Sequence, residues 1–178
     1  FEVLSVDNST NKDPSAASFT WTVDTTPPAT SINSATDGNK SAVTSGGTTK
    51  STSMTFTFSG NDTGGVGIDH FECNVDGLTF VTCTSPFTFP SLLKDGTHSF
   101  RVMSEDKVGN RGSSPTSFNW TVDTVAPTTT IDSATDGNKS AVTSDGSTKS
   151  TSMTLTFSGN DTNGVGIDHF ECSIDDDE

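Results

Sequence analysis

The sequence has few positive charges and no long hydrophobic run. Nine Lys and Arg stand against 23 Asp and Glu, so the formal net charge of the 178 residues is −14 at pH 7. This balance argues against nucleic acid as a partner, because phosphates require a basic face. It favours a solvated surface or bound cations. No apolar run is long enough to span a bilayer, so no membrane insertion is expected. An initiator Met and a signal peptide are also absent, so we expect a fragment or a processed product.

Hydrophobic residues are scarce as well, at 29% of the chain, whereas Ser and Thr account for 58 of the 178 residues. Scarcity alone would favour disorder. The apolar residues nevertheless alternate with Thr, as in Met54-Thr-Phe56-Thr-Phe58, and this period of two is typical of half-buried strands. Because Gly-rich turns separate such segments and no helical periodicity is present, the sequence predicts an all-β fold.

A repeat of 99 residues organises the chain. Residues 34–73 return at 133–172 and differ only at positions 46, 48, 56 and 64. Residues 1–79 align with 100–178 without a gap, and 53 of the 79 pairs are identical. A period of this length without slippage predicts tandem units, each the size of a domain.

One complete unit is expected at 26–123, flanked by two partial units. Seven short strands in a unit of this size suit a two-sheet sandwich of immunoglobulin type. Residues 1–25 would supply the last two strands of a preceding unit, and 124–178 the first three strands of a following one. Both partial units would leave open sheet edges and a half-covered core. The seven strands are expected at 29–34, 53–59, 68–76, 80–84, 86–90, 97–105 and 116–122, with a long loop at 35–52.

Alternation along these strands predicts which side chains form the core. Trp21 and Trp120 occupy matching positions of the last strand, and we expect both in the core rather than on a ligand platform. The side chains expected to face inward in the complete unit are Met54, Phe56, Phe58, Phe71, Cys73, Val75, Phe100, Val102, Phe118, Trp120 and Val122.

Cys73 and Cys83 are expected to form a disulfide. If the two stand directly opposite one another in a hairpin, Val75 faces Val81 and a three-residue loop, 77–79, remains. Their Cβ atoms would then lie at a separation that a disulfide can bridge. Two free buried thiols are the alternative. A disulfide implies an oxidising, extracytoplasmic compartment. Cys172 repeats Cys73, and its partner would lie beyond residue 178.

Several motifs together resemble the Ig-like repeats of large bacterial and archaeal cell-surface proteins. They are Phe71-Glu-Cys-Asn-Val-Asp-Gly77, Cys83-Thr-Ser-Pro86, Asp95-Gly-Thr-His-Ser-Phe-Arg-Val102, Asp106-Lys-Val-Gly-Asn110 and Trp120-Thr-Val-Asp-Thr124. The resemblance implies extracellular display in stalks, adhesin shafts, surface layers or filaments. The chain departs from the family pattern in the length of segment 35–52 and in the acidic residues 175–178, which replace a Gly-Leu-Thr turn.

Acidic residues are expected to gather where one unit meets the next. In a sandwich of this strand order, Asp24 would meet the loops at 60–67 and 106–110, and Asp123 would meet the equivalent loop of the following unit. Oxygen ligands suit Ca²⁺, and related adhesin repeats bind calcium at such junctions, so the resemblance supports this ion. Ordinary turn chemistry of Asp and Asn is the alternative. The candidate ligands are Asp24, Asp62, Asp69, Asp106, Asn110, Asp123, Asp161 and Asp168.

Six Asn-x-Ser/Thr sequences are candidate glycosylation sites. Five lie on loops or near termini, and the sixth alternates outward between Phe118 and Trp120, so modification is sterically feasible. The candidates are Asn8, Asn39, Asn61, Asn119, Asn138 and Asn160.

The three histidines, His70, His98 and His169, show neither metal-ligand spacing nor a Ser-His-Asp grouping. We expect them to be exposed strand residues, and we predict that the chain is not an enzyme. No cofactor other than calcium is expected.

The leading prediction is a structural or adhesive surface protein whose repeats form a shaft or filament, with copies of itself as partners. The alternatives are a module that binds glycans or host surfaces, and an accessory segment of a secreted hydrolase. Near-identical units favour the shaft, because a recognition tip would diversify its loops. The two partial units are complementary portions of one sandwich, so copies could join by sharing strands. Alternatively, the sequence is a stretch of a longer array.

Overall fold

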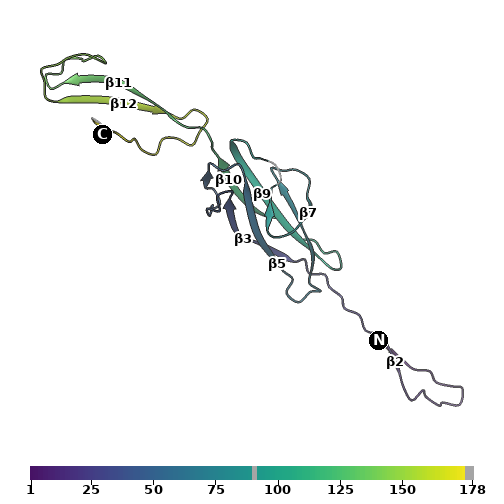
Figure 1. Cartoon of the computed structure of the whole chain (residues 1–178). Helices are drawn as coiled ribbons and strands as arrows, with labels where there is room; N and C mark the ends of the chain where they lie inside the picture. The colour runs from purple at the N-terminus through teal and green to yellow at the C-terminus, as the bar shows by residue number, and fades with distance from the viewer. Residues whose placement is uncertain (90–91, 175–178) are drawn as a thin grey trace.

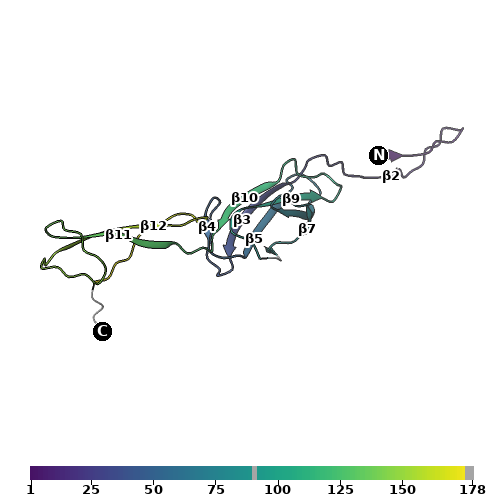
Figure 2. The same ribbon diagram turned by 90° about the horizontal axis from the view of Figure 1, so that it is seen from above.

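Strands joined by turns make up the described part of the chain, residues 1–89 and 92–174, in a computed structural model. A short N-terminal hairpin, a central body of two sheets and a C-terminal hairpin follow one another along an elongated molecule (Figure 1, Figure 2). The all-β prediction is confirmed for these residues. None of them belongs to a helix that is long and apolar enough to cross a membrane.

The central body consists of two sheets that pack face to face. One contains β3 (Ala29–Asp37), β5 (Met54–Asn61) and β8 (Phe87–Thr88), in that spatial order. The other contains, in spatial order, β4 (Thr48–Thr49), β10 (Thr116–Val122), β9 (Gly96–Asp106), β6 (Ile68–Val75) and β7 (Val81–Cys83). All seven expected strands are present, six with shifted ends and the last, 116–122, with the expected bounds. Residue 90, at the end of the expected strand 86–90, lies outside the described residues.

Aromatic side chains from both sheets fill the space between them. The Phe56 ring from β5 stacks on Phe100 from β9 at a centroid distance of 4.2 Å and lies 5.3 Å from Trp120 of β10. Complete burial of one such side chain contributes roughly 1.5–3 kcal/mol, so this cluster dominates the stability of the body. Ten of the eleven side chains expected to face inward are buried; Phe71 is half-buried and packs edge-on against Phe58.

The segment expected to be a loop at 35–52 contains an additional strand. β4 runs parallel to β10, with a hydrogen bond from Thr121 N to Gly47 O at 2.9 Å and another from Asp123 N to Thr49 O at 3.0 Å. The buried Thr49 hydroxyl donates to Asp37 Oδ2 at 2.9 Å, which holds β4 against the end of β3. The edge of β10 is therefore covered by this segment.

The N-terminal hairpin keeps the register of β9 and β10, but over a much shorter length. β1 (Glu2–Val3) pairs with β2 (Ala17–Ser18), and Glu2 stands opposite Ser18 as Arg101 stands opposite Ser117 99 residues later. The pairing ends at Phe19, which exchanges backbone hydrogen bonds with Phe1 at 2.8 and 2.9 Å, and Trp21 is 63% exposed. The expectation that Trp21 lies in a core is therefore wrong, because the described residues include no facing sheet to cover it.

The C-terminal hairpin reproduces one pair of strands from the central body. β11 (Thr128–Asp136) pairs with β12 (Met153–Asn160), with the same bulge after Ile131 that follows Ile32 in β3. The expected third strand of this unit is not formed by residues 167–174. In the central body, β9 and β7 flank the equivalent strand β6, and the printed sequence holds no counterpart of either after residue 174. The acidic residues 175–178 lie outside the described residues.

Candidate metal centre

Asp106 closes the turn between β9 and β10 with both oxygens of its carboxylate. Oδ1 accepts hydrogen bonds from the backbone nitrogens of Val108 and Asn110, both at 2.9 Å, and Oδ2 accepts one from Asn110 Nδ2 at 2.8 Å. Gly109 adopts a φ of 91°, a conformation that favours glycine. Asp106 and Asn110 therefore stabilise a turn, which was the alternative role considered for them. Asp7, Asp37 and Asp136 accept the same pair of backbone hydrogen bonds, from the residues two and four positions later.

The pKa of the buried Asp106 carboxyl lies below its usual value of 3.8. Burial acts to raise this pKa, because removal from water disfavours the charged form. The hydrogen bonds from the side chain and backbone of Asn110, and from Val108 and Gly109, stabilise the carboxylate and together outweigh burial. Asp106 therefore remains an anion at neutral pH although only 2% of its surface is exposed.

Asp62 begins the loop between β5 and β6 and keeps one carboxylate oxygen free of hydrogen bonds. Oδ2 accepts from Gly67 N at 2.7 Å, whereas Oδ1 is buried and has no hydrogen-bond partner. Gly65 makes this position possible, since a Cβ there would overlap the carboxylate. A buried oxygen without a partner is destabilising by about 1–3 kcal/mol, so Oδ1 has a strong requirement for a proton donor or a cation.

Asp24 reaches both loops from the chain that enters the central body. Its Oδ2 accepts a hydrogen bond from Val66 N at 2.8 Å, and its Oδ1 accepts one from Thr26 N at 2.9 Å. Its backbone carbonyl accepts a further hydrogen bond from Asn110 Nδ2 at 3.1 Å. Asn110 therefore positions Asp24 and Asp106 through its amide nitrogen.

The structure thus brings three of the expected carboxylates together. One oxygen from each of Asp24, Asp62 and Asp106 lies within 4.8 Å of the other two. Carboxylates at this separation repel one another unless a cation lies between them. Ca²⁺ accepts six to eight oxygen ligands, including carboxylates and backbone carbonyls, so the donor set and the unpartnered Asp62 Oδ1 fit this ion.

The second junction repeats the first. Asp123 Oδ2 accepts a hydrogen bond from Val165 N at 2.9 Å, and Asp161 Oδ2 accepts one from Gly166 N at 2.7 Å. Asp161 Oδ1 is buried without a partner, as is Asp62 Oδ1. The counterpart of Asp106 would be residue 205, beyond the printed sequence. A further contact was not anticipated: Asp95 accepts hydrogen bonds from the backbone and hydroxyl of Thr124, at 2.8 and 2.9 Å, and fixes the chain that leaves β10.

Asp69 and Asp168 are not brought to these clusters. Asp69 Oδ2 lies 2.9 Å from Nδ1 of His70, and Asp168 Oδ2 lies 2.7 Å from Nδ1 of His169. Hydrogen bonds to Asp168 and Glu171, together with the charge of Asp168, raise the pKa of the exposed His169 above 6.5. Both carboxylates therefore pair with a neighbouring imidazole.

The disulfide between Cys73 and Cys83 is confirmed, with a Cα–Cα distance of 5.9 Å. The expected register is wrong: Cys73 stands opposite Val81, and Cys83 stands opposite Phe71, so the cysteines are diagonal neighbours. The reason is that the chain turns one residue earlier than expected: Leu78 N donates a hydrogen bond to Val75 O at 3.1 Å, and Asp76 and Gly77 adopt positive φ values of 53° and 73°. Cys172 is free and exposed.

His98 is buried, and the expectation that it is exposed is wrong. Its Nδ1 lies 2.7 Å from Asp76 Oδ2, its Nε2 lies 2.8 Å from the carbonyl oxygen of Lys94, and its ring lies 5.5 Å from that of Trp120. His98 has the same parity on β9 as Phe100, and this alternation was the signal that could have identified it. His70 is half-buried and His169 is exposed.

The candidate glycosylation sites are all accessible. Asn119 points outward from β10 between the buried Phe118 and Trp120, as its alternation predicts. Asn8, Asn39, Asn61, Asn138 and Asn160 are also exposed.

Comparison of the sequence with protein-family models and with curated proteins returns no match, so the residues and geometry of the chain are the basis for its interpretation.

Proposed function

We propose that the chain belongs to an extracellular structural or adhesive surface protein, in which Ig-like sandwiches repeat every 99 residues and form a shaft or filament. Ca²⁺ held by Asp24, Asp62 and Asp106 stiffens the first junction, and the counterparts of these residues, which include Asp123 and Asp161, would hold it at the next. The observation that carries the proposal is the recurrence of one junction contact: Asp24 binds Val66, and 99 residues later Asp123 binds Val165, through the same atoms.

A recurring contact of this kind favours a regular array. Units that are joined only by a linker move relative to one another by default. Here a carboxylate from the entering chain is bonded to the loop of the next unit at both junctions, so each unit would take the same orientation relative to its neighbour. When every unit has the same orientation relative to the one before it, the array forms an extended rod. A shaft requires this shape.

The chemistry of the junction explains how calcium would contribute. The ion would place positive charge among the three carboxylates. Oxygen ligands from both sides of the boundary would bind it. Asp24 then binds the ion in addition to Val66, while Asp62 and Asp106 hold the ion to the central body. Removal of the ion would restore repulsion between the carboxylates, and the junction would loosen.

Three further observations support an extracellular location. The Cys73–Cys83 disulfide is stable in an oxidising compartment. The net charge of −14 keeps a display protein solvated, and the six Asn acceptor sites are accessible. The proposal assigns no catalytic step to the chain.

The location is tested on cells of the source organism with antibodies against the central body. We expect labelling of intact cells, and loss of the signal after brief protease treatment of the cell surface. A cytoplasmic protein serves as the control that stays unlabelled until the cells are permeabilised. Labelling that requires permeabilisation would contradict the proposal.

A further inference from the structure

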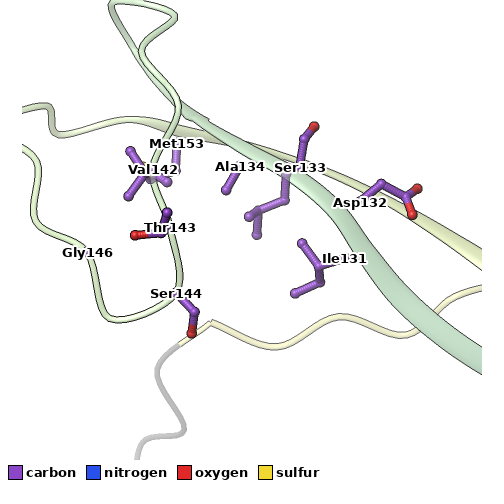
Figure 3. Close-up of a pocket in the computed structure, with 10 residues that line it drawn as sticks. Ile131, Asp132, Ser133, Ala134, Val142, Thr143, Ser144, Gly146 and Met153 are labelled. Atoms are coloured by element: carbon purple, nitrogen blue, oxygen red, sulfur yellow. The ribbon is translucent and has the colours of Figure 1, made fainter.

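A hollow of about 700 Å³ lies against the C-terminal hairpin. In Figure 3 its lining includes Ile131, Ala134, Val142 and Met153. The residues 99 positions earlier belong to the core of the central body or pack against it, and they are Ile32, Ala35, Val43 and Met54. The hollow is therefore the core space of a repeat unit and not a ligand site.

At the first junction, the segment 110–112 supports the chain that enters the central body. Asn110 Nδ2 donates a hydrogen bond to the carbonyl oxygen of Asp24 at 3.1 Å. Gly112 lies close to the same chain, since a Cβ at this position would stand 3.3 Å from the carbonyl oxygen of Pro28. The backbone nitrogen of Gly112 donates to the carbonyl oxygen of Ser104 in β9 at 3.0 Å. The segment therefore contacts the entering chain at two points.

Arg111, at the centre of this segment, is fixed from the other side by its long side chain. Its Nη2 forms an ion pair with Oε2 of Glu72 in β6, whose side chain is only 22% exposed. The Arg111 guanidinium also lies over the ring of Phe80, with its Cζ 5.7 Å from the ring centroid. A guanidinium that pairs with a carboxylate and stacks on an aromatic ring has a defined orientation. Arg111 therefore holds the segment 110–112 against β6.

The ion pair of Arg111 connects the two loops that form the junction. Glu72 lies on β6, which begins directly after the loop that carries Asp62 and Val66. Arg111 directly follows the turn that carries Asp106 and Asn110. The position of one loop relative to the other therefore depends on this pair.

We propose that Arg111 is a positioning residue of the first junction. Held by its ion pair and by the aromatic ring, it orients Asn110 toward the entering chain and determines how firmly Asp24 is bound to the central body. Its effect on calcium affinity rests on the proposed function, because it acts through the ligands of that ion. Its effect on the hydrogen bond from Val66 N to Asp24 Oδ2 does not.

The repeat supplies a conservative replacement for Arg111. Lys12 stands 99 residues earlier and forms the same kind of backbone bridge, with Val6, as Arg111 forms with Glu105. A lysine keeps the positive charge but lacks the planar fork of donors and the stacking surface of a guanidinium. Arg111→Lys should therefore retain part of the positioning effect.

Charge and positioning predict opposite effects on calcium. Arg111 is a cation next to a ligand of the proposed ion, so its charge alone disfavours a second cation, and its removal would tighten binding. Loss of a group that orients metal ligands instead weakens metal binding, typically by about 10–100-fold. The direction of the change therefore separates the two effects.

Calcium titration calorimetry of the full 178-residue chain tests the proposal. Arg111→Ala should weaken calcium binding by about tenfold, and Arg111→Lys by less. Arg101→Ala, the matched control, removes the same charge from an exposed position of β9 and should not weaken binding. Equal or tighter binding by Arg111→Ala than by the parent would overturn the proposal.

A double-mutant cycle tests whether Arg111 acts through Glu72. Glu72→Gln should also weaken calcium binding, and its combination with Arg111→Ala should add little, because both changes break the same contact. Fully additive losses would show that the two residues act independently, against the proposal. Exposed ion pairs contribute little to stability, so all of these variants should melt near the parent in chelator.

Hydrogen exchange of the Val66 amide in chelator provides a readout that needs no calcium. Arg111→Ala should accelerate this exchange by roughly fivefold, the effect of one weakened hydrogen bond, whereas Arg101→Ala should exchange like the parent. A parent chain that does not bind calcium would refute the calcium part of the proposed function, and Val66 would then decide the role of Arg111 alone. Exchange as slow in Arg111→Ala as in the parent would overturn that role.

Discussion

Asp24 Oδ2 accepts a hydrogen bond from the backbone nitrogen of Val66 at 2.8 Å, across the boundary between the N-terminal segment and the central body. The same carboxylate lies within 4.8 Å of those of Asp62 and Asp106, so one residue both joins the two parts and brings a third negative charge to the cluster. The stability of the junction should therefore depend on cations.

Calcium is expected to raise the melting temperature of the central body, because the ion would relieve the repulsion among Asp24, Asp62 and Asp106. At a free concentration one hundred times the Kd, a ligand that binds only the folded state stabilises it by about 2.7 kcal/mol. Asp62→Asn should abolish the shift, since it removes a ligand charge and leaves an oxygen for Gly67 N. Differential scanning calorimetry with calcium and with chelator measures the effect.

Asp69→Asn is the control for this calcium experiment. Asp69 also carries a negative charge at the start of β6 but pairs with His70, so its replacement should leave the calcium response intact. If calcium and chelator gave identical melting curves for the parent chain, the three carboxylates would have no role beyond turn formation and the Val66 contact.

Reduction of the Cys73–Cys83 disulfide should destabilise the central body. A cross-link that closes so short a loop contributes about 2–3 kcal/mol by restricting the unfolded chain. For a body of this size the melting temperature should fall by roughly 10–20 °C. Thermal unfolding of the double variant Cys73→Ser/Cys83→Ser measures the loss, and Cys172→Ser, which removes the free thiol, should melt like the parent. A double variant as stable as the parent would show that packing alone holds β7.

Met54 and Met153 offer the same side chain at equivalent positions in a covered and an uncovered sheet. Met54 is completely buried, so Met54→Ala should destabilise the central body by about 2–5 kcal/mol through lost contacts and a cavity. Met153 is 45% exposed, and Met153→Ala should leave urea unfolding of a dilute, monomeric chain nearly unchanged. Losses of equal size would show that the C-terminal hairpin is already packed in the monomer.

Acid should destabilise the protein below about pH 4. Hydrogen bonds from Ser41, Thr49 and Asn39 lower the pKa of Asp37 below 3.8, against the opposing effect of burial. A depressed pKa in the folded state means that the contribution to stability is complete above the unfolded value and is lost as the pH falls through the folded value. Urea unfolding of the parent should therefore weaken steeply below about pH 4.

Asp37→Ala identifies the contribution of this carboxylate. The variant should be less stable than the parent at neutral pH, and its stability should fall less as the pH is lowered through the acid range. Parallel declines for the two proteins would show that Asp37 does not contribute to the acid sensitivity.

Much of the central body could be predicted from alternation. Met54, Phe56 and Phe58 occupy alternate positions with Thr between them. Because side chains of a strand point to opposite faces in turn, all three are expected to face the same way. The same rule placed Asn119 outside. β4 could not be predicted, since Thr48 and Thr49 carry no apolar pattern and their strand exists only because β10 offers open backbone groups. Local sequence does not encode such pairing.

The candidate site was predictable in part, because the repeat and the strand order determine which loops meet. Asp24, Asp62 and Asp106 meet as expected. Asp69 does not join them. Successive side chains of a strand point to opposite faces, and the Asp69 carboxylate pairs with the neighbouring His70 instead. The strand expected after residue 166 is not formed for a different reason. A strand requires a partner strand, and the equivalent strand β6 is hydrogen-bonded to β9.

The central claim, a rigid junction between successive units, is tested most directly by small-angle X-ray scattering of the 178-residue chain in dilute solution. In calcium, the scattering should fit one extended rod, and Asp24→Ala combined with Asp123→Ala should give a shorter mean extension and a broader distribution of distances. Addition of chelator should shift the mean extension and the distance distribution of the parent toward those of the double variant. Identical scattering profiles from all of these samples would contradict the claim.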